Sequence, residues 1–380
     1  MLFHTTDIDD TARAVLGEID DLRERLRLRL HEPQRWHGSL RRLSFARAIQ
    51  GSNSIEGYNA ELDDVAAVAL GEPPLDAGSE TALALAGYRD AMTFVLQLAS
   101  DPEFSYSPQL LKSLHFMMTS YHLPNRPGQW RSGTVFVRDD EADRVVYEGP
   151  DVDEVPDLMV ELAEELNQQS QLPHLISAGM AHLNLVMIHP FRDGNGRMAR
   201  GLQSLVLARS GLLSPIFMSI EEYLGRNTTE YYRVLADVGK GSWQPSGATR
   251  LWTRFLLTAH LRQARTVLRR AKESEQLWME LDRMVSNRGL PNRSLAVLFD
   301  AASGLRVRNG TYQAALRGSD EIVSFQTASR DLQALVKAEL LIPKGQARGR
   351  WYVASPKLRE LRQQLANSRN GREDSDPFGG

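Results

Sequence analysis

The residues whose types and spacing could do chemistry run from His189 to Arg200: His-Pro-Phe-Arg-Asp-Gly-Asn-Gly-Arg-Met-Ala-Arg. Apolar residues at helical spacing flank this stretch, over 175–188 before it and over 202–213 after it. Pro190 disfavours helical angles at His189, so the first helix is expected to end there. The pattern predicts a short polar connection between two buried helices.

The connection has the features of a phosphate-binding turn. Gly194 and Gly196 let a phosphate approach the backbone closely. Free N–H groups converge where the second helix begins, near Asn195, and attract an anion. Arg197 and Arg200 are three residues apart, so they share a helix face and could grip further phosphate groups.

An acid and a base complete the set. Asp193 lies beside these cations and would hold Mg²⁺, which usually takes one or two carboxylates together with substrate phosphates. His189 opens the turn and can act as a general base near neutral pH. These parts predict a phosphoryl- or nucleotidyl-transfer site. The alternative is a polar helix–helix turn with a capping Asp and solvated arginines.

The stretch resembles the signature of the Fic domain family, His-x-Phe-x-Asp/Glu-Gly-Asn-Gly-Arg-x-x-Arg, and meets every specified position. The resemblance implies a mainly α fold, with a Fic helical core and a β-hairpin flap. It implies transfer of AMP from ATP to a Tyr, Thr or Ser hydroxyl of a target protein. Phe191 would anchor the turn in the core. Gly196 argues against the Doc kinases, a related branch with Lys at that position.

The resemblance also implies a role for each polar residue of the turn. Residues 194–197 would hold the phosphates of ATP, with Asn195 and Arg197 orienting them. Asp193 would carry Mg²⁺ between the α- and β-phosphates. Arg200 would grip the γ-phosphate, and His189 would take the proton from the attacking hydroxyl. Little covalent chemistry falls to the protein, so positioning and charge stabilisation dominate.

A second motif lies near residues 45–60. Ser52, Glu56 and Gly57 match Ser/Thr-x-x-x-Glu-Gly/Asn, which many Fic proteins carry on an inhibitory helix. The resemblance implies an ion pair between Glu56 and Arg200. A carboxylate there would occupy the clamp for the γ-phosphate and repel that phosphate. The alternative is an exposed Glu that follows a Ser cap.

A β-hairpin is predicted between residues 126 and 150. Val135 and Val137 alternate with other residue types, residues 139–143 form a polar tip, and the apolar pattern returns at 145–147. The hairpin resembles the Fic flap, which would dock the target segment as an added strand near Val135 and Val137. A plain surface hairpin is the alternative.

Helices are expected elsewhere. Their ranges are 8–32, 41–49, 61–71, 81–99, 108 onward, 153–169, 221–238 and 252–284. By resemblance, Asn227 and Tyr231 in the penultimate range would line the nucleotide pocket, although helix packing would explain them nearly as well. His115 and His122 receive no role, because a lone histidine on an apolar face is more often structural.

Residues 290–355 resemble a winged helix. A short helix at 295–301 and a helix from 327 toward 341 precede a basic two-strand wing. The helix from 327 would read a DNA groove, and Lys344, Arg348 and Arg350 would contact phosphates. Protein contact or dimerisation at the wing is the alternative.

Composition bounds the remaining questions. The chain has 380 residues, a net charge of −3 and no cysteine, which excludes disulfides and a thiol nucleophile. Neither a signal peptide nor a membrane span is apparent, so a cytoplasmic protein without membrane contact is expected. The expected organisation is N-terminal helices at 1–100, a Fic core at 101–270, a linker helix and winged helix at 271–360, and a disordered tail at 361–380. Self-modification and a homodimer stay open.

Two other functions also stay open. An enzyme of the same fold could remove AMP, with Glu56 positioning a water, and would lose activity in Glu56→Gly. A DNA-binding regulator could use the site only to sense ATP, and its DNA binding would survive His189→Ala.

Overall fold

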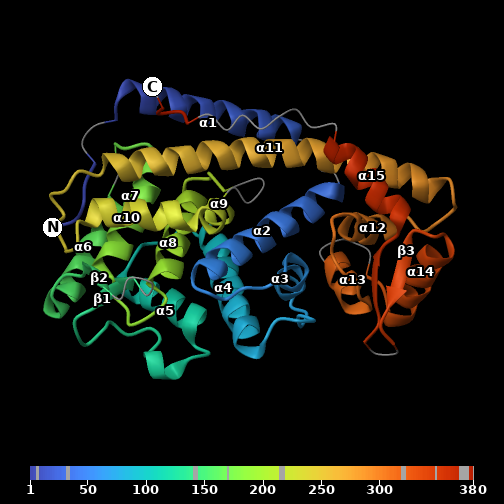
Figure 1. The fold of residues 1–380 in the computed structure, drawn as a ribbon, viewed down its shortest axis with the longest axis horizontal. Helices are drawn as coiled ribbons and strands as arrows, with labels where there is room; N and C mark the ends of the chain where they lie inside the picture. Colours follow the sequence, from blue (N-terminus) through green and yellow to red (C-terminus); the bar gives the residue numbers. More distant parts are fainter. Residues whose placement is uncertain are drawn as a thin grey trace.

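The computed structural model describes residues 1–5, 8–30, 35–139, 144–168, 171–213, 219–317, 322–346, 349–367 and 376–379. Helices dominate these residues, and the strands form two small antiparallel hairpins (Figure 1). The helices of the first part are α1 (Asp10–Arg29), α2 (Arg35–Ile55), α3 (Leu62–Ala69), α4 (Ser79–Leu98), α5 (Pro108–Thr119), η1 (Leu123–Asn125), η2 (Val152–Glu154), α6 (Val155–Asn167), α7 (His174–Ile188) and α8 (Asn195–Arg209). The later helices are α9 (Glu221–Arg226), α10 (Thr228–Gly239), α11 (Arg250–Ser286), α12 (Ser294–Ala302), α13 (Asn309–Leu316), α14 (Phe325–Lys337) and α15 (Pro356–Asn367). The strands are β1 (Phe136–Asp139), β2 (Arg144–Glu148), β3 (Leu341–Lys344) and β4 (Trp351–Ala354).

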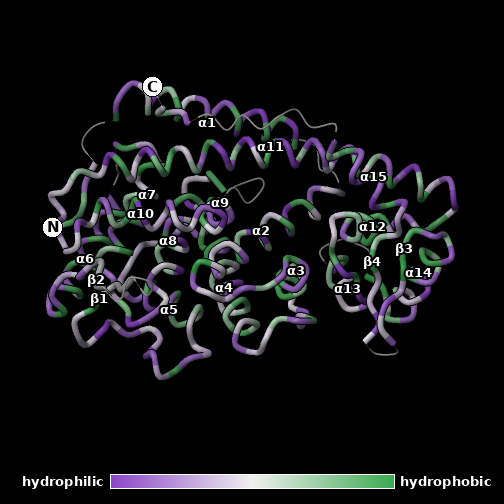
Figure 2. The backbone as a smooth tube through the Cα atoms, in the orientation of Figure 1, coloured by the Kyte–Doolittle hydropathy of each residue, from purple (hydrophilic) through white to green (hydrophobic). Residues whose placement is uncertain are grey.

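The helices α7 and α8 form the centre of the larger unit. Both are buried around most of their circumference, which explains why their sequences lack a polar stripe. The long α11 runs across them, and α1 lies along α11 on the outer side (Figure 1). Buried residues of these four helices belong to one hydrophobic core, and Figure 2 shows hydrophobic and polar residues alternating along the helices. The mainly α fold with a β-hairpin is therefore confirmed.

The first hairpin pairs β1 with β2 in antiparallel register, Phe136 opposite Glu148, with an irregularity after Val137. The expected hairpin is thus present. Tyr147 ties β2 to the centre of the fold, because its hydroxyl donates to the carbonyl oxygen of Met187 at 2.9 Å. The hairpin is therefore fastened beside the end of α7.

The second unit contains α12, α13, α14 and the β3–β4 hairpin, with a bridge between Val307 and Tyr352. These are the elements expected of a winged helix, and the assignment itself stays a prediction. Lys344 and Arg350 are exposed at the hairpin, whereas Arg348 lies outside the described residues.

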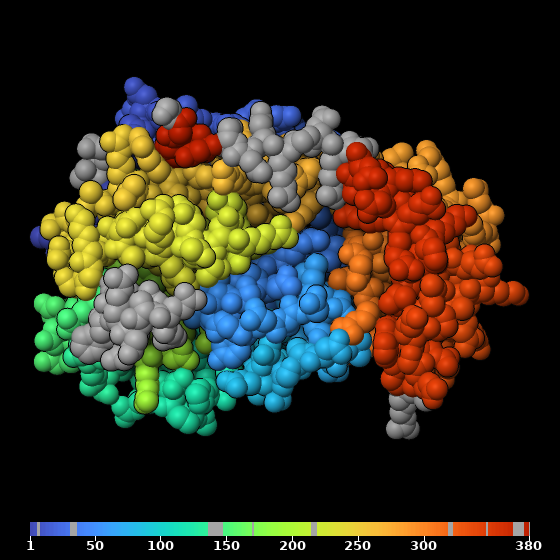
Figure 3. Space-filling model, in the orientation of Figure 1, coloured from blue at the N-terminus to red at the C-terminus, as the bar shows by residue number. Residues whose placement is uncertain are grey.

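Contacts join this second unit to the N-terminal helices. Leu43 of α2 belongs to the second unit's hydrophobic core, whereas Ile49 and Ile55 of the same helix belong to the first. Arg306 forms ion pairs with carboxylates at the start of α3 and in the segment after it: Asp63, Asp64 and Asp76. The helix α11 likewise contributes Ala271 to the first core and Leu277 to the second, so α2, α11 and the ion pairs of Arg306 connect the two units, which meet in Figure 3.

Some expected boundaries are wrong. The single helix expected over 221–238 is interrupted at Asn227, which separates α9 from α10. Residues 361–367 continue α15 and are not a disordered tail. Phe378 packs on the larger unit, with the guanidinium of Arg254 5.1 Å from the centre of its ring. The other residues of that tail, 368–375 and 380, lie outside the described part. Of the described helices, none is long and apolar enough to cross a membrane.

Candidate active site

The turn between α7 and α8 contains two residues with left-handed backbone angles, His189 and Gly194. The helix α7 ends at Ile188, as expected, and His189 takes left-handed angles, φ 52° and ψ 56°, not the extended angles that a following proline favours. A non-glycine residue in this region costs free energy, so the surrounding structure must hold it there. Gly194 is also left-handed, at φ +75°.

Asn195 closes the turn. Its side-chain oxygen accepts from the N–H of Phe191 and its side-chain nitrogen donates to the carbonyl of Phe191, both at 2.9 Å. The side chain is buried, and its oxygen and nitrogen both bond to the backbone of Phe191, so it supports the turn. Its role in orienting phosphates stays a prediction.

His189 is arranged as a base. Its Nδ1 lies 3.1 Å from the carbonyl oxygen of Val186, an acceptor, so the ring proton belongs on Nδ1 and Nε2 keeps a lone pair. Burial lowers the pKa of His189, which keeps the ring neutral at physiological pH. The backbone of the residue is held from the other side, because Nε of Arg131 donates to the carbonyl oxygen of His189 at 3.0 Å.

Phe191 anchors the turn, as expected, and is fully buried. It stacks on the ring of His115 with centroids 3.7 Å apart and planes 2° apart. His115 also bridges two segments: its Nδ1 accepts from the N–H of Gly128 and its Nε2 donates to the carbonyl of Asp193, both at 2.8 Å. Burial lowers the pKa of His115 to about 4, so the bridging ring is neutral.

Asp193 presents a carboxylate beside the phosphate-binding end of α8. One oxygen accepts from the N–H of Gly194 at 2.7 Å, and the other accepts from the side-chain nitrogen of Asn125 at 3.0 Å. Each oxygen keeps a further lone pair, and a half-buried carboxylate of this kind is a hard oxygen ligand suited to Mg²⁺. In the described part of the chain no group of three or more acidic or histidine side chains gathers as a metal site, so phosphate oxygens would supply the other ligands.

Arg200 meets the N-terminal motif directly. Its Nη2 donates to a carboxylate oxygen of Glu56 at 2.6 Å and to the carbonyl of Ser52 at 2.9 Å, while its Nε donates to Oγ of Ser52 at 2.8 Å. The ion pair expected between Glu56 and Arg200 is therefore present. Burial alone would lower the pKa of Arg200, but attraction to Glu56 outweighs it and the pKa is raised. The remaining Nη1 is buried without a partner among the described residues.

Arg197 is covered by the same N-terminal segment. Its guanidinium is fully buried and lies over the rings of Tyr58 and Tyr121, 5.1 Å and 5.8 Å from their centres. Its Nη1 donates to the hydroxyl of Tyr121 at 2.9 Å. Because Tyr58 follows Glu56 by two residues, one short segment contacts both arginines of the motif. A side chain at Gly196 would clash with Glu56, so glycine is also needed for this approach.

The two residues predicted to line the nucleotide pocket have partners within the protein. Tyr231 is 1% exposed and its hydroxyl is 2.8 Å from Nε2 of His182, in an aromatic cluster with Trp252. Its ring is packed in the core, and its role at the nucleotide pocket stays a prediction. Asn227 uses its side-chain nitrogen on the carbonyl of Tyr223 at 2.7 Å and joins α9 to α10.

Three supporting residues were missed in the sequence. His115 and Arg131 hold the turn through atoms far away in the chain, and Tyr58 covers a cation of the site. The Pro-Gly-x-Trp-Arg run at 127–131 was the only available signal for Arg131. For His115 and Tyr58 the sequence offers no comparable pattern.

Comparisons with known proteins agree with this geometry. The family model described as Fic/DOC family matches residues 105–207. Protein adenylyltransferase fic-1 of Caenorhabditis elegans is 36% identical over 93 residues, 24% of this chain and 17% of the relative. Protein adenylyltransferase Fic of Nematostella vectensis is 26% identical over 209 residues, 52% of this chain and 44% of the relative. The chain thus spans less than half the length of these relatives.

Solved structures show the same fold. A Fic family protein from Desulfovibrio desulfuricans has a TM-score of 0.58 at 21% identity, covering 92% of this chain and 98% of that chain. Fic-1 of C. elegans has a TM-score of 0.54 at 23% identity, covering 69% of this chain and 73% of that chain. The family match and the complete signature identify residues 105–207 as a domain of the Fic/DOC family.

Proposed function

We propose that this protein transfers AMP from ATP to a hydroxyl group of a target protein, and that Glu56 restrains the reaction. The observation that carries the proposal is the contact of Glu56 with Arg200 beside a complete Fic turn. The named relatives are protein adenylyltransferases, which supports the same activity for this chain.

The turn supplies binding and proton transfer. The backbone N–H groups at the start of α8, near Gly196, face the phosphates of ATP, and Arg197 compensates their charge. Nε2 of His189 accepts the proton from the target hydroxyl, whose oxygen bonds to the α-phosphorus while the bond to the leaving pyrophosphate breaks. Asp193 would hold Mg²⁺, which supplies charge neutralisation at the phosphates.

Glu56 would restrain the reaction in two ways, by repelling the γ-phosphate of ATP and by occupying the side chain of Arg200. Its carboxylate takes the side of Arg200 on which a γ-phosphate would bind, and its negative charge repels that phosphate. Arg200 still offers the buried Nη1, which has no partner in the described part of the chain. Release of Glu56 would free the second nitrogen and complete the clamp.

The target would reach His189 along the hairpin. Strand β1 follows the segment of residues 131–135, in which Arg131 donates a hydrogen bond to the carbonyl oxygen of His189. An extended target segment added beside residues 135–137 would place a hydroxyl near the base. The protein itself is one candidate target, which makes self-modification a useful assay.

The decisive test uses ATP labelled at the α-phosphate with wild type, Glu56→Gly and the double variant Glu56→Gly/His189→Ala. Label should accumulate on protein in Glu56→Gly and fall to background when His189 is also removed. An unfolded double variant would give the same loss, so its thermal unfolding must match that of the single variant.

A different outcome would point to a different enzyme. If wild type released AMP from a modified protein and Glu56→Gly did not, Glu56 would be a group that positions water. The transferase proposal would then be wrong for the wild-type protein. Label in wild type equal to that in Glu56→Gly would refute the restraint by Glu56.

A further inference from the structure

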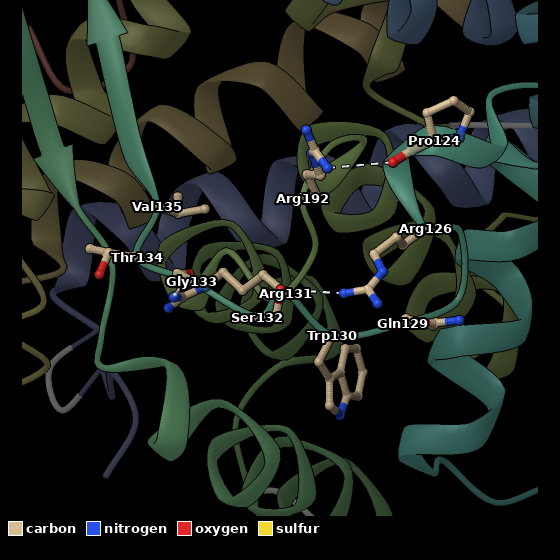
Figure 4. A pocket seen from close by; sticks show the side chains of 10 residues that line it. All are labelled: Pro124, Arg126, Gln129, Trp130, Arg131, Ser132, Gly133, Thr134, Val135 and Arg192. Atoms are coloured by element: carbon tan, nitrogen blue, oxygen red, sulfur yellow. Dashed lines mark hydrogen bonds between the residues drawn. The ribbon is translucent and has the colours of Figure 1, made fainter.

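A depression beside the active site carries positive charge that the proposed reaction does not use. It has a volume of about 390 Å³ and lies between the segment after η1 and the segment that leads into β1 (Figure 4). Its lining residues are Pro124, Arg126, Gln129, Trp130, Arg131, Ser132, Gly133, Thr134, Val135 and Arg192. Three of these are arginines and none is acidic, although the whole chain has a net charge of −3.

Two of the arginines have no carboxylate partner among the residues that the structure describes. Arg126 and Arg192 are both exposed. Nη1 of Arg126 makes a long hydrogen bond of 3.4 Å to Oγ of Ser132, and Nη1 of Arg192 makes one of the same length to the carbonyl of Pro124. Each guanidinium therefore keeps most of its five N–H donors for a ligand.

The third arginine adds a fixed charge. Arg131 is buried, and its guanidinium donates to the carbonyls of His189, Gly133 and Pro150, all uncharged acceptors. Lys112 contributes another cation nearby, with its Nζ 4.6 Å from the centre of the Trp130 ring. Asp151 attracts the charge of Arg131 but does not line the depression, so the lining itself should hold a positive potential.

Such a site fits a small anion that is planar or tetrahedral, a carboxylate or a phosphate monoester. Guanidinium groups bind both in fork geometry, with charge-assisted hydrogen bonds. The uncharged lining, which includes Val135 and Trp130, would accept the short stem of a side chain. The site is suited to the end of an acidic side chain and is too exposed for a buried cofactor.

The position of the depression indicates that the anion belongs to the target protein. Arg192 lies three residues after His189, and Val135 immediately precedes β1. A peptide strand advances about 3.3 Å per residue, so a segment on β1 can place a hydroxyl near His189 and another side chain over this depression. The two side chains would be only a few residues apart in the target.

We propose that this depression, the arginine pocket, selects target segments with an acidic or phosphorylated residue a few positions from the modified hydroxyl. The inference deepens the proposed function and rests on it for the transfer step. The arginine pocket contacts the target, whereas the residues that the Fic signature specifies carry out the reaction. Selection therefore resides in residues that the signature leaves open, including Arg192 within the turn.

The test uses Tyr-containing peptides that differ at one position. A set of peptides places Asp, phosphoserine or Ala at each of the three positions on either side of the Tyr. Binding is measured by calorimetry at low salt with Glu56→Gly, and AMP transfer is measured with the same peptides. We expect one or two positions at which Asp or phosphoserine raises affinity about 10-fold over Ala, as charge-assisted bonds would.

Variants locate the effect. Arg126→Ala/Arg192→Ala should abolish the preference while leaving affinity for the Ala peptides within about 2-fold, and Arg126→Glu/Arg192→Glu should reverse it toward Lys peptides. Arg288→Glu, a charge reversal at an exposed arginine in another part of the chain, should change nothing. A preference for Asp alone or for phosphoserine alone would identify the source of the anion.

The outcomes separate the two proposals. Equal binding of acidic and Ala peptides at every position, or an acidic preference that survives both double variants, overturns the arginine pocket whether or not AMP is transferred. A preference lost in the variants, with no transfer to any peptide, leaves the arginine pocket in place and counts against the proposed function.

Discussion

Replacing His115 with Phe tests how the turn is held. The change keeps an aromatic ring of similar size against Phe191 and removes both ring nitrogens. The N–H of Gly128 and the carbonyl of Asp193 then lose partners that now lie at 2.8 Å. Each unsatisfied group costs about 1–3 kcal/mol. Because both residues are half-buried and water can reach part of each, we expect a loss of about 2–4 kcal/mol near pH 7.

The loss should depend on pH. The pKa of His115 is about 4 in the folded protein, below the usual 6.5, so the unfolded chain takes up a proton first as the pH falls. The wild type therefore keeps the contribution of His115 above pH 6.5 and loses it toward pH 4. The loss amounts to about 3 kcal/mol, from 1.36 kcal/mol per unit of pKa. The variant has no titrating group at position 115, so it does not lose this stability. The difference in free energy of unfolding between wild type and variant should therefore become smaller as the pH falls.

Urea unfolding at about pH 7 and pH 4.5 measures both effects. The buried His182 and His260, each with a pKa lowered by burial to about 3, are present in both proteins and cancel in the difference. His174→Phe, at an exposed histidine, is the matched control. The bridging role of His115 would be refuted if His115→Phe lost the same free energy of unfolding at both pH values, or lost no more than His174→Phe. In the Glu56→Gly background, AMP transfer should also fall, because the backbone of Asp193 is released.

Three further changes probe the segments around the turn. Tyr58→Ala removes a ring that lies over Arg197, a contact worth about 0.5–2 kcal/mol. Because the contact holds Arg197 away from the phosphates of ATP, its loss should raise labelled AMP transfer about 2- to 30-fold. A fall in transfer would mean that the ring contacts the nucleotide. Gly194→Ala should lower the melting temperature more than Gly211→Ala does. Both glycines have positive φ, but of the two only Gly194 would place a Cβ against another side chain, at 2.8 Å. Equal losses of stability in the two variants would exclude that clash. Arg306→Ala leaves Asp63, Asp64 and Asp76 without their shared cation. Urea unfolding should show a loss of about 1–3 kcal/mol in the free energy of unfolding, and this loss should shrink at high salt. A loss that does not depend on salt would argue against ion pairing.

Local chemistry made the turn predictable. Pro190 and the glycines act on the backbone within a few residues, so the end of α7 and the start of α8 could be read from the sequence. The alternation around Val135 predicted the hairpin for the same reason. The angles at His189 could not be predicted, because distant groups such as Arg131 hold them.

Residue type alone does not assign a role to the residues predicted to line the nucleotide pocket. Tyr231 has the polar and aromatic character of a pocket residue, but the same character suits a buried ring whose hydroxyl has a partner. That partner, His182, lies 49 positions away in the chain. Only the packing of α10 against α7 decides between the two roles, and helical spacing in one sequence does not contain that information.

The N-terminal motif depends both on local chemistry and on contacts with distant parts of the chain. Ser52 and Glu56 are one helical turn apart, so their common orientation is local, but the cation that they share is 144 positions from Glu56. What holds them there is α2 itself, whose Leu43 packs in the second unit while Ile49 and Ile55 pack in the first. A helix that packs in both cores cannot slide or rotate without disturbing one of them. Displacement of Glu56 should therefore proceed by a change after Ile55, where the helix ends and Gly57 has positive φ, and not by movement of α2 as a whole.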